Sequence, residues 1–196
     1  MAITINGSGT VTGLAVGGLP DGTVDNDTIA AATIADAKMA SGGGKVLQVV
    51  SITKTDTFTT AANNVEVAIT GLAATITPSA TTSKIKVDIS ISHGSSGVTH
   101  KLRVKRGGTL IGAGDASGNR HRAGIPLPLH ADDNQAYASS FSYLDSPSTT
   151  SATTYSTYTI ADNGVELLYV NRSKNDANTA TGGRYISTIT LTEIGA

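Results

Sequence analysis

The segment SKIKVDISIS, residues 83–92, decides the fold class. Every second residue is a branched apolar one and most of the residues between are charged: Ile85, Val87, Ile89 and Ile91 alternate with Lys84, Lys86, Asp88 and Ser90. Successive side chains of a strand point to opposite faces, so this period of two predicts a β-strand with one buried face and one solvent face.

Similar patterns recur along most of the chain. NVEVAIT alternates in the same way, and strands are also predicted in KVLQVVSITK, RVKRGGTLIG, ASSFSYLD, YTIADNGVELLYV and ISTITLTEI. Two of these segments read as hairpins, one turning at Gly107-Gly108 and one at Asn163-Gly164. About eight or nine short strands separated by turns predict an all-β protein, an antiparallel β-sandwich of jelly-roll-like topology.

The chain divides at SGGGK, residues 41–45, because three consecutive glycines make a flexible hinge. Residues 45–196 are the predicted β-sandwich domain. Residues 1–44 are predicted to be an extended arm, with short strands around Asn6-Gly7 and short helical turns in the alanine-rich part. Helices of two turns are not stable alone, so we expect the arm to need a partner.

Composition excludes several classes of function. The chain has no cysteine, so it has neither disulfides nor thiolate metal sites. A net charge of −1 argues against wholesale binding to nucleic acid or to an anionic membrane. We also expect no transmembrane insertion and no signal peptide, since no apolar run approaches the length of a membrane span.

Several segments resemble, in order, the C-terminal β domain of bacteriophage fibre proteins of the kind found in cyanophages. They are residues 44–60, GKVLQVVSITKTDTFTT; 110–123, LIGAGDASGNRHRA; 143–155, YLDSPSTTSATTY; 169–176, YVNRSKND; and 187–196, STITLTEIGA. The phrases ITINGSGTVTG, GGLPDGTV and TIADAKMA in the arm are similar to the shaft or anchor repeats that precede this domain. The resemblance implies a homotrimeric virion structural protein, assembled in the bacterial cytoplasm and released by lysis.

The arm shows a spacing of five that fits a trimer. Its larger apolar residues recur at that interval: Leu14, Leu19, Val24, Ile29, Ile34 and Met39. Five steps of about 100° do not return to one face of a helix, but chains winding around a shared axis can each contribute one residue per pentad. We interpret these residues as a trimerisation and attachment device that contacts other virion proteins; the alternative is a linker with accidental spacing.

Two functions on the virion remain open. In the first, the protein is a tail fibre-type adhesin whose β domain binds host surface polysaccharide. In the second, it is a head fibre or cement protein that decorates the capsid. The short arm and single domain suit decoration, whereas the family resemblance in its commonest form suits the tail.

The residues do not predict an enzyme, and no cofactor or metal is expected. Asp132 and Asp133 are adjacent and do not form the separated carboxylate pair of a glycosidase. No G-x-S-x-G motif occurs, and GAGDAS does not open a helix. The histidines lack the spacing of a metal site and are expected at the surface.

Two groups of residues are candidates for binding acidic or polar sugars. The first is a loop, residues 114–135, that holds Asn119, Arg120, His121 and Arg122, whose planar donors match sugars and carboxylates. The second is a basic face on a predicted strand, formed by Lys101, Arg103 and Lys105. The alternatives are a trimer contact or solvated loop for the first group and a solvated sheet face for the second.

Overall fold

The structure is a computed structural model that describes residues 45–95, 97–129, 132–161, 167–180 and 182–195. All regular structure in these residues is β-strand. The strands are β1 Val46–Lys54, β2 Phe58–Thr60, β3 Val67–Ile76, β4 Lys84–Ser95, β5 His100–Arg106, β6 Thr109–Ile111, β7 Ile125–Leu127, β8 Tyr137–Asp145, β9 Thr153–Ile160, β10 Leu168–Val170 and β11 Ser187–Ile194. The arm, with its predicted pentad residues and helical turns, lies outside the described residues.

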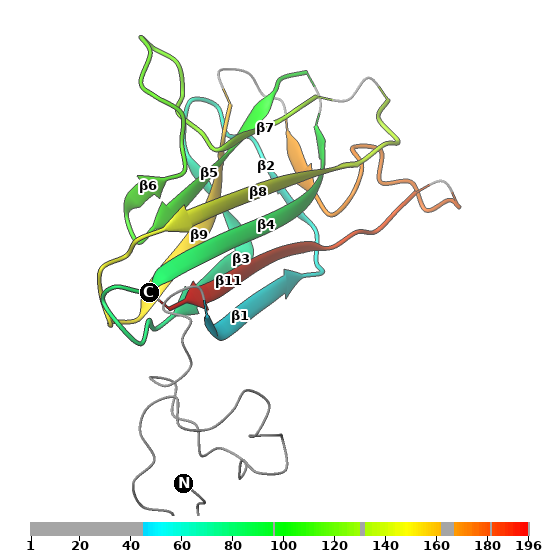
Figure 1. Cartoon of the computed structure of the whole chain (residues 1–196). Coiled ribbons are helices and arrows are strands. Elements are labelled where there is room, and N and C mark those ends of the chain that lie inside the picture. Colours follow the sequence, from blue (N-terminus) through cyan, green and yellow to red (C-terminus); the bar gives the residue numbers. More distant parts are fainter. Residues whose placement is uncertain (1–44, 96, 130–131, 162–166, 181, 196) are drawn as a thin grey trace, which may run out of the picture. The chain divides into compact units, whose positions relative to one another are not determined.

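The first sheet is built around the long strand β4. One edge of β4 pairs with β8, and the other edge pairs with β11 and β10, which lie end to end along it. On its outer edge β11 pairs with β1, and β10 pairs with β2. All of these pairs are antiparallel, and Figure 1 shows β8, β4, β11 and β1 side by side in one layer.

The second sheet has the order β3, β9, β5, with β6 and β7 sharing the far edge of β5. Each sheet therefore has four strand positions, and the chain passes repeatedly from one sheet to the other. The order β1, β11, β4, β8 in one sheet and β3, β9, β5, β7 in the other is that of an eight-position jelly roll. The predicted antiparallel sandwich of jelly-roll-like topology is confirmed.

The core lies between the inward faces of the two sheets, as the alternation in residues 83–92 predicts. The four apolar residues of that segment are 0–2% exposed. They pack with Leu102 and Val104 of β5 and with Leu191 of β11, all fully buried. The C-terminal strand β11 lies between β1 and β4, so it is held on both edges.

One of the two predicted hairpins is confirmed and the other is wrong. β5 and β6 pair antiparallel around Gly107-Gly108, with Arg106 opposite Thr109 and with φ of +55° at Gly107. β9 and β10, which the sequence indicated as a second hairpin, do not pair, because β9 belongs to the second sheet and β10 to the first. The turn residues Asn163 and Gly164 lie outside the described residues. Alternating patterns identify two strands but do not say whether they share a sheet.

Two buried polar residues join strand ends across the first sheet. Asn171 follows β10 with φ of +64°; its amide donates to the carbonyls of Lys54 and Asp56 at 2.9 Å each and accepts from Ser187 at 2.6 Å. Glu193 of β11 is also buried and accepts from Gln48 at 2.6 Å. It accepts two further bonds from Ser79, from the backbone at 2.7 Å and from the hydroxyl at 2.6 Å.

A candidate binding cleft between β6 and β8

The connection from β6 to β7, residues 112–124, lies directly against β8 because glycines occupy both of its ends. A methyl group added at Gly112 would lie 2.5 Å from Cζ of Phe141, and one added at Gly124 would lie 2.6 Å from Cε2 of the same ring. Gly112 also has a φ of +54°, a backbone conformation that residues other than glycine rarely adopt. The two glycines therefore let this connection close over the middle of β8.

Beside this contact a cleft of about 660 Å³ opens at one end of the sandwich. It lies between β6 with its following loop and the end of β8. Its lining combines two arginines, one carboxylate, one tyrosine and several apolar groups: Arg106, Leu110, Ile111, Gly112, Ala113, Arg122, Tyr143, Leu144, Asp145 and Ser146. The charges sum to +2 from the arginines and −1 from Asp145, which leaves the cleft with a net charge of +1.

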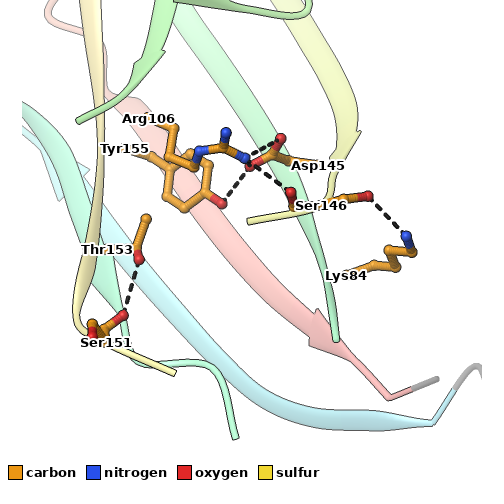
Figure 2. A network of polar contacts seen from close by, with 7 residues as sticks. All are labelled: Lys84, Arg106, Asp145, Ser146, Ser151, Thr153 and Tyr155. Carbon is orange, nitrogen blue, oxygen red and sulfur yellow. Dashed lines mark hydrogen bonds and ion pairs between the residues drawn. The ribbon is translucent and has the colours of Figure 1, made fainter. Parts of the chain in front are cut away.

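The polar wall of the cleft joins the two sheets (Figure 2). Nη1 of Arg106 donates to both carboxylate oxygens of Asp145 at 2.9 and 2.8 Å and to the carbonyl of Ser146 at 3.1 Å. The Tyr155 hydroxyl donates to the same carboxylate at 2.7 Å. Burial, and then the hydrogen bond to Asp145, raises the pKa of Tyr155 well above its ordinary value. The tyrosine therefore stays protonated as a donor.

This wall leaves hydrogen-bonding capacity for a ligand. The three contacts of Arg106 all use Nη1, so its Nε and Nη2 meet no acceptor within the described part of the chain. Arg122 donates Nε to the carbonyl of Gly114 at 2.7 Å, and no carboxylate among the described residues pairs with it. The side chain of Tyr143 is 39% exposed beside them. Unused guanidinium edges next to an aromatic ring suit an anionic ligand that also has a flat apolar face.

The four predicted loop residues do not act as one group. Arg122 lines the cleft, whereas Arg120 turns back and donates to the Ser117 hydroxyl at 2.9 Å. His121 contacts the Asn64 side chain at 3.1 Å, and Asn119 is exposed. The structure therefore separates Arg122 from its neighbours as the residue of the loop that lines the cleft.

The predicted basic face exists, but an acidic residue and an aromatic ring occupy part of it. Lys101, Arg103 and Lys105 share the outward face of β5, opposite the buried Leu102 and Val104. Glu66 forms ion pairs with Arg103, at 3.4 Å, and with Lys105. Lys105 also lies 4.8 Å from the ring centre of Tyr158. This face of β5 therefore carries mixed charge rather than a purely basic patch.

Arg106, Asp145 and Tyr143 were not identified from the sequence as parts of a site. The alternation of inward and outward residues along the strands did indicate that Arg106 and Asp145 face inward. Arg106 continues the inward series of Leu102 and Val104, and Asp145 continues the inward series of Phe141 on β8. A charged residue at an inward position at the end of a strand must find a partner across the sandwich. No local motif joins them, because 39 residues separate Arg106 from Asp145.

The histidines were expected at the surface, and two of them are fully buried. His93 contacts the hydroxyl of Ser139 at 3.0 Å, and His100 contacts the hydroxyl of Thr159 at 3.3 Å. Within the described residues no group of three or more histidine or acidic side chains is placed to hold a metal ion. Within the same residues no helix has the length and apolar character to cross a membrane.

Fold and site together define the class: a jelly-roll β protein with a candidate binding cleft of net positive charge between its sheets. No protein-family model and no curated protein sequence matches the chain. Among solved structures, the chain is similar to one in the structure of infectious bursal disease virus, Gt strain, with 13% identity and a TM-score of 0.38. That match covers 75% of this chain and 40% of the viral one. For the Gx strain of the same virus the identity is 13% and the TM-score is 0.37, and the match covers 75% of this chain and 39% of the viral one.

This chain thus spans less than half the length of the viral chains that it matches. Its jelly-roll topology is defined by the strand pairing within the chain itself.

Proposed function

We propose that this protein is a bacteriophage virion structural protein, a homotrimeric tail fibre-type adhesin that binds host surface polysaccharide with its β domain. The cleft between β6 and β8 is the observation that carries the adhesin role. It has guanidinium donors that meet no acceptor among the described residues and an exposed aromatic ring, and its one lining carboxylate is already held by Arg106 and Tyr155. This arrangement binds rather than catalyses. Jelly rolls are common among viral coat and lectin domains, which agrees with the role.

Residues 1–44 would attach the protein to the particle and join its three copies. Support for association also comes from β1, the edge strand that directly follows the arm in sequence. Residues 46–53 carry no charge, and Val46, Leu47, Val49 and Ile52 are 38–57% exposed. Edge strands of monomeric proteins are usually protected by charged residues or proline. An uncharged apolar edge favours contact with another copy of the chain.

Replacing Val49 by lysine is therefore expected to weaken assembly of the full-length protein. A charge on the exposed edge of β1 opposes its burial against another copy. Light scattering after size exclusion is expected to show a mass of three chains for the parent and a smaller species for Val49→Lys. Val65→Lys is the control, because Val65 is 63% exposed and lies outside β1. A variant that stays fully trimeric at low protein concentration would remove β1 from the contact.

The second candidate, a capsid decoration protein, is favoured by the same uncharged edge, which would equally suit contact with a shell protein. Gold-labelled antibody raised against the full-length chain distinguishes the two when intact particles are viewed by electron microscopy. We expect label at the tail. Label spread over the head would establish decoration, and unlabelled particles would contradict a virion role altogether.

A further inference from the structure

We propose that the cleft recognises a carboxylate-bearing sugar, such as a uronic acid unit of an acidic polysaccharide. The inference rests on the proposed adhesin role, and it names the chemical class of ligand for that site. In this arrangement the ligand carboxylate binds Arg122 and the free edge of Arg106, and a sugar ring lies on Tyr143.

Charge selects the class of ligand. The two arginines outnumber the single carboxylate of the lining, and that carboxylate is already engaged by Arg106 and Tyr155. A guanidinium presents parallel N–H donors that match both oxygens of a carboxylate, and such charge-assisted bonds are about twice as strong as neutral ones. A neutral sugar would leave the net positive charge of the cleft unused.

The positions of the two arginines divide their roles. Arg106 is fixed by three contacts, and its side chain is 27% exposed, so it is a preorganised donor at the cleft wall. Arg122 is exposed and is oriented by one bond to the carbonyl of Gly114. Arg106 therefore fixes where the carboxylate lies, and Arg122 supplies the cation that has no carboxylate partner among the described residues.

The apolar part of the cleft suits a sugar rather than a small inorganic anion. Tyr143 and Leu144 are 39% and 53% exposed and contribute to the lining beside Leu110. The C–H face of a pyranose ring packs on such surfaces, whereas phosphate or sulfate gains nothing from them. A volume of about 660 Å³ exceeds that of one sugar unit, so the cleft admits a short segment of a polysaccharide.

The test uses the full-length protein and two probes of equal length, tetragalacturonate and a neutral galactose tetramer. Titration calorimetry is expected to show binding of the acidic tetramer and at least about 10-fold weaker binding of the neutral one. Raising the salt concentration from about 50 to about 500 mM is expected to weaken the acidic complex, because part of it is exposed ion pairing. Equal affinity for the two probes, or no binding of the acidic one, would overturn the inference.

Variants locate the site. Arg122→Ala and Tyr143→Ala are each expected to weaken binding of the acidic tetramer by about 10-fold. Arg120→Ala is the matched control, because this arginine is two residues away and its guanidinium is turned to Ser117; we expect a change of less than about 2-fold. Equal losses for Arg120→Ala and Arg122→Ala would place binding outside the cleft. Circular dichroism confirms that each variant is folded.

This outcome is separable from that of the proposed function. Particle labelling and competition of the purified protein with phage adsorption test the virion role without assuming any ligand. A protein that blocks adsorption but does not bind tetragalacturonate would keep the adhesin role and overturn the acidic class. A protein that binds tetragalacturonate but is absent from particles would keep the acidic class of ligand and overturn the virion role.

Discussion

Replacing Asn171 by alanine is expected to lower the free energy of unfolding by about 3 to 4 kcal/mol, because this buried side chain makes three hydrogen bonds. Two of these bonds go to the carbonyls of Lys54 and Asp56, and the third is made with Ser187. Each contributes about 1 kcal/mol, and holding alanine at a φ of +64° costs about 1 kcal/mol more. Urea denaturation at neutral pH measures the change.

Asn64→Ala is the matched control for this prediction. Asn64 also has a positive φ, of +51°, but it is exposed, so its replacement is expected to cost about 1 kcal/mol. Asn171→Gly separates the two contributions, because glycine accepts the backbone conformation but lacks the amide. If Asn171→Ala cost no more than Asn64→Ala, the three bonds of the Asn171 side chain would contribute nothing, and Asn171 would not be the link between β10, β11 and the end of β1.

Replacing Glu193 by glutamine is expected to cost about 3 kcal/mol at pH 7, and this loss should vanish in acid. Burial by itself would raise the pKa of Glu193, but the hydrogen bonds from Ser79 and Gln48 outweigh it and hold the pKa at about 2, below the ordinary value of 4.5. A shift of that size corresponds to about 3 kcal/mol of stability from the ionised form.

The direction of the pH dependence follows from the lowered pKa. The folded protein binds the proton less tightly than the unfolded chain, so the stabilisation is complete above pH 4.5 and is lost as the pH falls toward about 2. The difference in unfolding free energy between the parent and Glu193→Gln is therefore expected to shrink steadily between these values. Asp88→Asn, on the outer face of β4, is the control: it removes one exposed ion pair, so we expect it to cost less than about 1 kcal/mol at pH 7. A constant difference from pH 7 to pH 2 would contradict the lowered pKa.

The fold was largely predictable because its strands carry a period of two. The inward residues of β4 and the turn at Gly107-Gly108 were identified from pattern and turn chemistry alone. The pairing of strands was less predictable, as the false hairpin between β9 and β10 shows. Local sequence reports which face of a strand is buried, whereas the choice of partner depends on contacts between residues far apart along the chain.

The candidate site was also predictable only in part. Arg122 was identified from a loop rich in planar donors, and its neighbours Asn119, Arg120 and His121 were grouped with it because sequence adjacency suggests a common surface. In the folded chain their side chains diverge, because a turn closed by the Arg120 amide and the Ser117 carbonyl points successive residues in different directions. The other members of the cleft come from two different sheets.

By itself, the sequence determined the class of fold, the inward face of β4 and the absence of cysteine chemistry. Only the tertiary structure decided that Arg106 meets Asp145, that Tyr155 supports this pair, and that Arg122 lies at the same cleft. The reason is physical. Alternation is a property of neighbouring residues, but a charged group buried between two sheets acquires its partner only when the sheets pack together.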